Sequence, residues 1–296
     1  MFWILISLIS PLMHGVANVL DNYLANKLFK NIWTLTFYSS LLNVVFIPFV
    51  FLIQIPDFPP QHLLIFFFIV AIIDVLYLIP YYKALQQEDT SVITALFSLG
   101  RIFVPIFAFF TIGETLSSTQ YVGFLIVILC GAATTFNSKS RFKFNTSFFY
   151  MIICSIMLAI QAVVYKYIFN QVSWSTGFLW PIIFSCLISL FFLFIPVLRK
   201  DIWLSRKDFT KNLPVFVSEE IFTFIGSGAG MYAISLASVS LVKSISSFQA
   251  IFVLIYAIIL HRFFPTIFRE DISYKSVCRK IILFIIMIGG IILIVR

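Results

Sequence analysis

Two charged residues, Asp74 and Arg101, each interrupt a long run of apolar residues in this sequence. They lie at similar distances before and after the short polar stretch near Gln87, so each would lie about 20 Å along a helix that meets that turn. Two antiparallel helices would then bring both side chains to the same depth. We expect either a structural ion pair or a binding site, in which Arg101 holds an anionic substrate group and Asp74 exchanges partners or protons.

Hydroxyl side chains accompany Arg101 along its run. Thr94, Ser98 and Arg101 recur at helical spacing, so a helix would carry them as one polar stripe. Such a stripe is expected to face a wet cavity and contact substrate, although hydroxyl groups also join helices to one another. Tyr81, on the same side of its run as Asp74, is expected to line the same cavity.

The first apolar run carries a second polar face. His14, Asn18 and Asp21 follow one another at helical spacing, so they share one side of the run. Asn18 is a candidate substrate contact. His14 either carries a proton or is a hydrogen-bonded packing residue. Asp21, near the end of the run, either lines the cavity or pairs with Lys27 or Lys83.

The second half of the chain adds further candidates. Glu219 and Thr223 share a helix face; Thr223 is a candidate substrate contact and Glu219 a candidate proton site. Of the tandem pair Glu219 and Glu220, we expect one side chain to be solvated and the other buried. The small residues at 226–230 permit either close packing or a break in the helix. Lys243 either reaches the membrane surface or points into the cavity and contacts substrate.

The composition places these residues in an integral membrane protein. Of 296 residues, 61% are hydrophobic and 11% charged, and the mean hydropathy is +1.06. The net charge of +8 comes mainly from short loops, which membrane topology explains without a nucleic-acid partner. The four cysteines form no CxxC or metal-binding spacing, so we expect no metal and no cofactor.

The apolar runs predict an all-α protein with ten transmembrane helices. Sixteen of the 20 Lys and Arg fall after the odd-numbered runs, which predicts that both termini lie outside the cell. The ten runs cover approximately residues 2–26, 33–54, 62–84, 91–111, 118–136, 147–169, 176–198, 214–236, 240–262 and 279–295.

The two halves of the chain resemble each other weakly but in the same order. The stretch at residues 81–105 resembles that at 231–255, and residues 123–132 resemble residues 281–290. Five helices in each half would give the halves opposite orientations, the inverted repeat typical of secondary transporters. We therefore predict a first repeat at residues 1–137, a basic cytoplasmic linker at 138–146 and a second repeat at 147–296.

The chain resembles the EamA-like members of the drug/metabolite transporter superfamily. The second half matches less well, because the usual proline of the ninth helix and the Gly-Glu after it are absent. The resemblance implies ten helices in two inverted repeats and a cargo of amino acids, related metabolites or drugs. The matching residues are Tyr82, Ala84, Leu85, Pro105, Gly113, Glu114, Gln120, Gly123 and Gly131 in the first half, and Tyr232, Leu236 and Gly289 in the second.

These features predict a secondary active transporter of the bacterial inner membrane. Its cargo would be a small polar metabolite that is amino acid-like or bears a carboxylate or phosphate. The protein would move this cargo by alternating access, with or without proton coupling. We expect a monomer or a weak homodimer. No HExxH, GxSxG, Walker or GxGxxG motif occurs, so we do not expect an enzyme. The alternative is a non-transporting scaffold or lipid-interacting protein of the same fold, in which all polar groups would be paired internally.

Overall fold

The computed structural model describes residues 2–88, 90–135, 146–261 and 274–295, and within these residues the chain is helical without strands. Helices suit a lipid environment because they satisfy their own backbone hydrogen bonds. The predicted linker at 138–146 lies almost wholly outside the described residues.

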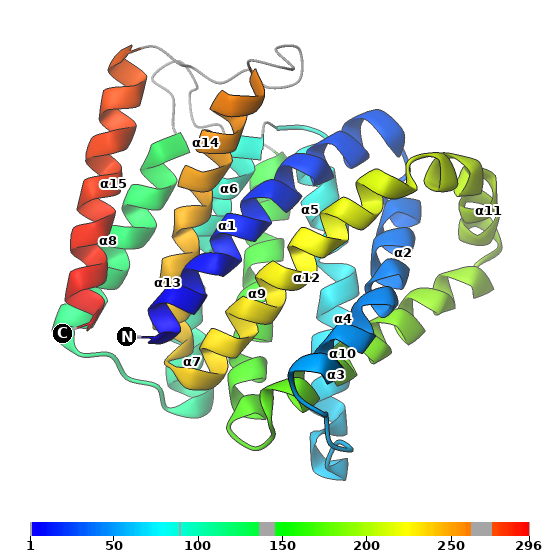
Figure 1. The fold of residues 1–296 in the computed structure, drawn as a ribbon, viewed down its shortest axis with the longest axis horizontal. Helices are drawn as coiled ribbons and strands as arrows, with labels where there is room; N and C mark the ends of the chain where they lie inside the picture. The colour runs from blue at the N-terminus through cyan, green and yellow to red at the C-terminus, as the bar shows by residue number, and fades with distance from the viewer. Residues whose placement is uncertain (1, 89, 136–145, 262–273, 296) are drawn as a thin grey trace.

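The first half of the chain contains α1 to α8 (Figure 1). A π-helical turn at Leu24–Leu28 extends α1, and a 3₁₀ turn at Asn43–Phe46 joins α2 to α3. The helices are α1 (Phe2–Tyr23), α2 (Ile32–Leu42), α3 (Ile47–Ile53), α4 (Leu64–Leu76), α5 (Leu78–Leu85), α6 (Thr90–Gly100), α7 (Phe103–Ile112) and α8 (Ser118–Thr135).

The second half contains α9 to α15. A 3₁₀ turn at Ser246–Phe248 joins α13 to α14, and α15 ends near the place where α1 begins (Figure 1). The helices are α9 (Thr146–Phe169), α10 (Trp174–Leu190), α11 (Pro196–Lys211), α12 (Leu213–Leu236), α13 (Val239–Ile245), α14 (Gln249–His261) and α15 (Tyr274–Val295).

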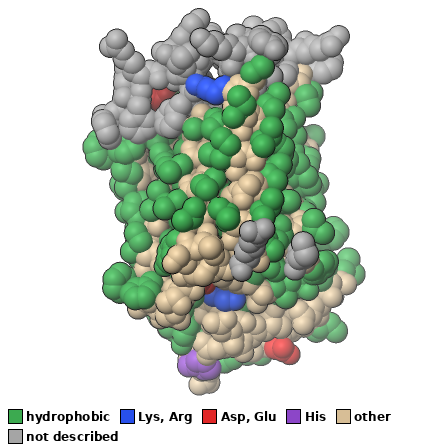
Figure 2. All heavy atoms as spheres, turned by 90° about the vertical axis from the view of Figure 1, so that its left-hand side faces the viewer, with side chains coloured by type: hydrophobic (Ala, Val, Ile, Leu, Met, Phe, Trp, Pro, Cys, Tyr) green, Lys and Arg blue, Asp and Glu red, His purple; other side chains and the backbone are tan. Residues whose placement is uncertain are grey.

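Several helices are long and apolar enough to cross a membrane. In the described part of the chain, six stretches meet this criterion by length and composition, and three shorter apolar helices accompany them. Figure 2 shows a broad band of hydrophobic side chains, with the visible Lys and Arg side chains near its two ends. This outward apolar surface confirms an integral membrane protein, whereas the count of ten crossings stays a prediction. The six stretches are Phe2–Leu28, Ile32–Ile53, Gln61–Leu85, Val92–Ile112, Thr146–Phe169 and Trp174–Phe194.

Besides the 3₁₀ turn that divides the predicted run 33–54 into α2 and α3, breaks interrupt three predicted runs that carry a charged candidate residue. The run with Asp74 breaks at Tyr77, and the run with Arg101 breaks at Arg101 itself. Proline explains both breaks, because it has no N–H to donate to the carbonyl four residues earlier and its ring clashes with that carbonyl. The carbonyl belongs to Leu76 for Pro80 and to Arg101 for Pro105.

The third break, between α13 and α14, contains no proline. There the Ser246 hydroxyl donates to the Val242 carbonyl at 3.3 Å, an interaction that bends helices. By contrast, α12 continues unbroken through its small residues at 226–230. These glycines instead allow close packing: a Cβ at Gly230 would lie 2.8 Å from Ser10 Oγ on α1.

The two halves of the chain interlock. Helix α1 packs along α12, α8 packs along α15, and α4 packs against α10. Figure 1 shows α1 and α12 side by side across the front of the molecule. The core therefore depends on contacts between residues far apart in sequence.

An additional helix, α11, occupies the stretch that was predicted to be a basic loop before residue 214. Pro196 begins it, as proline often begins helices, and Pro214 begins α12. Ile202 on α11 is buried, and its carbonyl accepts a hydrogen bond from the Tyr38 hydroxyl at 2.7 Å.

Candidate functional site

A cavity of about 240 Å³ lies between the two halves of the chain. Helices α1, α2, α4, α5, α6 and α7 and the turns at their breaks line it from the first half, and α9, α10, α12, α13 and α14 from the second. The breaks at Tyr77, Arg101 and Ser246 all reach it, and the turn between α2 and α3 reaches it through Asn43. The polar and charged lining residues are Ser10, His14, Asn18, Asp21, Ser39, Ser40, Asn43, Asp74, Tyr77, Tyr81, Tyr82, Arg101, Ser155, Gln161, Tyr165, Ser185, Glu219, Glu220, Thr223, Ser227, Lys243, Ser246 and Gln249.

Arg101 projects into this cavity from the break between α6 and α7. Its guanidinium donates to Gln249 Oε1 at 2.8 Å, to Ser247 Oγ at 3.1 Å and to Ser98 Oγ at 3.3 Å. These acceptors are neutral, so they orient the guanidinium without cancelling its charge. Lys243 lines the cavity as well and has no hydrogen-bond partner among the described residues.

The predicted pair between Arg101 and Asp74 is not present. Asp74 instead accepts a hydrogen bond from Gln161 Nε2 on α9 at 2.5 Å. The depth argument assumed two straight antiparallel helices, but the breaks at Tyr77 and Arg101 turn the two side chains toward different neighbours. Both residues nevertheless line the same cavity.

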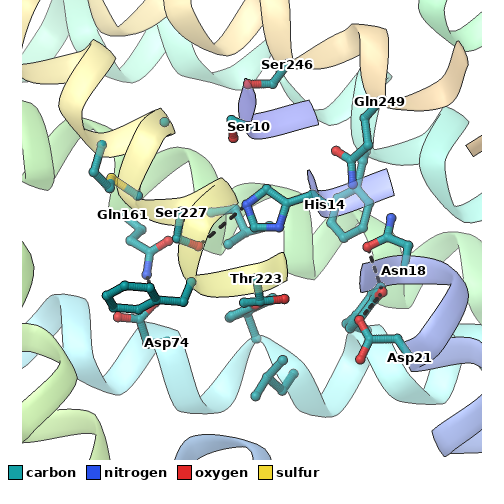
Figure 3. Close-up of a pocket in the computed structure, with 18 of the residues that line it drawn as sticks. Ser10, His14, Asn18, Asp21, Asp74, Gln161, Thr223, Ser227, Ser246 and Gln249 are labelled. Atoms are coloured by element: carbon teal, nitrogen blue, oxygen red, sulfur yellow. Dashed lines mark hydrogen bonds between the residues drawn. The ribbon is translucent and has the colours of Figure 1, made fainter. Parts of the chain in front are cut away.

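A cluster of acidic residues and tyrosines lies in another part of the cavity. The Tyr81 hydroxyl bridges Asp21 Oδ2 at 2.8 Å and Asn18 Oδ1 at 3.1 Å. Tyr82 reaches Asp21 Oδ1 at 3.4 Å. Figure 3 shows Asn18 and Asp21 on one side of His14, and Asp74 with Gln161 on the other. Asn18 and Tyr81 therefore lie where the sequence predicts, and Asp21 lines the cavity instead of pairing with a surface lysine.

Glu219 and Glu220 belong to the same acidic part of the cavity. Only 3% of Glu219 and 2% of Glu220 are exposed, so the prediction that one of them is solvated is wrong. Thr223 Oγ1 donates to Glu219 Oε1 at 2.7 Å. Glu219 Oε2, Glu220 Oε2 and the amide nitrogen of Asn18 are buried without a hydrogen-bond partner among the residues that the structure describes. A ligand with both donor and acceptor groups would satisfy them.

His14 occupies the middle of the lining. Its Nε2 lies 3.5 Å from Ser227 Oγ on α12, and a Cβ at Gly226 would approach the ring to 3.1 Å. The glycine thus gives the imidazole the room it needs between α1 and α12. His14 therefore lines the cavity as predicted, with one weak hydrogen bond.

Two predicted substrate contacts lie outside the cavity. Thr94 and Ser98 are buried, and their hydroxyls donate to backbone carbonyls one turn earlier, of Thr90 at 3.1 Å and of Thr94 at 3.2 Å respectively. Ser98 Oγ also accepts from Arg101, so it positions the guanidinium. Thr94 and Ser98 therefore lie behind the cavity wall and do not line the cavity.

Sequence reasoning missed several lining residues. Gln161 and Gln249, which hold Asp74 and Arg101, are amides within apolar runs, and that signal could have identified them. Glu220 lines the cavity too, although the sequence analysis names only Glu219 of this pair as a candidate site residue. In the described residues no group of three or more His, Cys, Asp or Glu side chains is arranged to hold a metal ion.

The fold and the site together define an integral membrane protein with a central cavity that charged and polar side chains from both halves of the chain line. Residues 1–136 match the model of the EamA-like transporter family, which agrees with the resemblance seen in the sequence of this part of the chain. Comparison with curated proteins finds no match.

Comparison with solved structures supports the fold over nearly the whole chain. A structure described as "Crystal structure of protein" superposes with a TM-score of 0.64 and 14% sequence identity. The similarity covers 97% of this chain and 98% of the other. At this identity the similarity concerns the fold alone.

Proposed function

We propose that this protein is a secondary active transporter that moves a small polar metabolite across the bacterial inner membrane by alternating access. The observation that carries the proposal is the cavity lined by charged groups from both halves of the chain. Two inverted five-helix repeats, at residues 1–137 and 147–296, would rock against each other around it, with both termini outside and the protein monomeric or weakly dimeric.

The helix breaks support a carrier. Transporters place substrate and ion sites at discontinuous helices, because a break frees backbone groups and permits movement. Here the breaks at Tyr77, Arg101 and Ser246 all meet the cavity, two of them in the first half and one in the second.

The charges of the lining favour a cargo with an anionic group. Arg101 would bind a carboxylate or phosphate directly, and Lys243 would add a second cation. The partnerless amide of Asn18 offers a donor, while Thr223 and Tyr81 lie beside the carboxylates that an ammonium group would approach. An amino acid-like molecule or another small carboxylate- or phosphate-bearing compound meets these requirements. The cavity volume of about 240 Å³ suits a small cargo.

Coupling to protons would use carboxylates that lack a cationic partner. Asp74 contacts an amide and Glu219 contacts a hydroxyl, so each could gain or lose a proton without breaking an ion pair. His14 lines the same cavity and makes one weak hydrogen bond, to Ser227. These three residues are the candidates for proton transfer during the cycle.

A non-transporting scaffold would pair its polar groups internally. The partnerless Asn18 amide and the free oxygens of Glu219 and Glu220 favour the carrier instead, because buried polar groups are rarely left unsatisfied without a ligand.

The test is a thermal-shift screen of the purified protein against amino acids, nucleotides, S-adenosyl compounds and sugar phosphates. A compound that binds the folded state raises the unfolding temperature. We expect Arg101→Ala to weaken binding of the active compound about 10- to 100-fold, since a hydrogen bond to a charged group is lost. Uptake of the same compound into proteoliposomes should fall in parallel.

Lys30→Ala removes an exposed cation and serves as the control. It should bind and transport as the unmodified protein does. A folded, monodisperse Arg101→Ala protein with unchanged affinity and uptake would overturn the assignment of Arg101 to the cargo.

A further inference from the structure

Helix α11 packs one apolar face onto the protein and exposes both cations and large apolar side chains on its other side. One face packs onto the protein through Leu198, Ile202 and Phe209, which recur at helical spacing. Figure 1 shows α11 at the edge of the molecule, beside α2 and the beginning of α12. Its opposite face is therefore free to meet the surroundings of the protein.

That free face combines cations with large apolar side chains. Val197, Trp203 and Leu204 are 69%, 66% and 67% exposed. The Arg206 guanidinium lies 4.1 Å from the centroid of the Trp203 ring, so a cation and an aromatic ring are presented together. The exposed cations on α11 are Arg199, Lys200, Arg206, Lys207 and Lys211.

The negative charges of α11 do not neutralise this face. Asp201 and Asp208 lie toward one flank of the helix by their sequence spacing, away from the outward line of Lys200, Lys207 and Lys211. Asp201 is held against the protein, because its Oδ2 accepts a hydrogen bond from Asn31 Nδ2 at 2.7 Å.

We propose that α11 is a binding surface for anionic phospholipids. Clusters of Lys and Arg on an amphipathic helix at a membrane surface attract anionic headgroups, while exposed Trp and Leu side chains enter the interface. The position of α11 at the ends of membrane-spanning helices places this face where headgroups lie. This site is separate from the cavity and does not depend on the identity of the cargo.

The contacts of α11 connect lipid binding to the cavity. The Tyr38 ring stacks on Phe209 with centroids 4.2 Å apart, and Phe209 meets Phe216 edge-on at 5.0 Å. Tyr38 directly precedes Ser39, and Phe216 lies one turn before Glu219 and Glu220, so both contacts adjoin lining residues. A lipid bound to α11 would therefore act on a helix that packs directly against α2 and α12, two of the helices around the acidic part of the cavity.

The test is a thermal-shift titration of the detergent-purified protein with short-chain phosphatidylglycerol and with short-chain phosphatidylcholine. We expect a larger rise in unfolding temperature with the anionic lipid, and a smaller difference at high salt. In the double variant Lys207→Gln and Lys211→Gln, the apparent affinity for phosphatidylglycerol should fall on the order of tenfold.

The matched control is the double variant Lys27→Gln and Lys30→Gln, which removes two exposed lysines elsewhere in the chain. It should titrate as the unmodified protein does. Equal responses to the two lipids would overturn the proposal, and they are the result expected if α11 binds a protein partner. Equal loss in both double variants would overturn it too, because the attraction would then be a general effect of net charge.

Discussion

At the scale of single residues, the environment of Arg101 differs from that of a structural ion pair. Its partners are a glutamine carbonyl and two serine hydroxyls, and one of them, Ser98, is held in turn by the backbone of α6. Neutral partners fix the direction of the guanidinium, and its full charge stays available to a ligand. Asp74 likewise has neutral neighbours, the Gln161 amide and the Tyr165 hydroxyl, so its carboxylate is available in the same way.

The structure distinguishes polar residues that face the cavity from those that support it. Ser227 lines the cavity, whereas Ser98 is fully buried behind it. In a variant lacking the native cysteines, we expect Ser227→Cys to react with a small water-soluble thiol reagent and Ser98→Cys to resist it, because only a thiolate reached by water reacts. Mass spectrometry of the labelled protein measures both rates.

A cargo identified by thermal shift should slow the labelling of Ser227→Cys. Comparable labelling of both variants would show that Ser98 faces water, which contradicts its supporting role.

At the scale of the elements, proline and glycine have different uses in this fold. Pro80 and Pro105 end helices next to the cavity, so that a turn of backbone and a side chain project into it. Gly226 and Gly230 leave α12 intact and let α1 approach it closely. The prolines thus shape the cavity, and the glycines allow close packing between α1, which carries His14, and α12, which carries Glu219.

The close approach of α1 and α12 makes a prediction about matched glycine substitutions. A Cβ at Gly230 would lie 2.8 Å from Ser10 Oγ, whereas a Cβ at Gly228 would meet no atom closer than 3.7 Å. Both changes gain helix propensity. We therefore expect Gly230→Ala to be less stable than Gly228→Ala by about 1–3 kcal/mol, the usual cost of overpacking.

Unfolding of the two variants in detergent measures this difference directly. Equal stabilities would mean that α1 and α12 separate without cost at this point.

At the scale of the whole molecule, neither half of the chain is complete by itself. The apolar faces of α1, α4 and α8 are covered by α12, α10 and α15, and the cavity takes its walls from both halves. In a half expressed alone, these helix faces would lose the helices that cover them, and the polar residues of the cavity would contact lipid.

This interlocking predicts the behaviour of a divided chain. Residues 1–137 produced alone should aggregate or fail to bind cargo, because their packing partners are missing. Coexpressed with residues 147–296, the two pieces should copurify as one complex and regain the ligand-induced thermal shift. Size-exclusion chromatography in detergent measures the first result, and the thermal-shift assay measures the second. A monodisperse, cargo-binding fragment of residues 1–137 would contradict the prediction.

The sequence alone determined that this is an integral membrane protein and identified most of the charged residues that line the cavity. Apolar runs must become helices in lipid, and a charged residue within such a run must face inward. His14, Asn18, Asp74, Tyr81 and Arg101 therefore line the cavity as predicted. The remaining predicted residues that do so are Glu219, Thr223 and Lys243.

Tertiary structure decided which side chains meet. Arg101 contacts Gln249, and Asp74 contacts Gln161, partners that lie 148 and 87 residues away in the sequence. Helical spacing predicts on which face and at what depth a side chain lies. Its hydrogen-bond partner depends also on where prolines bend the helices and on which distant helices pack together. The same holds for α11: its apolar residues have helical spacing, but only the fold shows that this face packs against Tyr38 and Phe216.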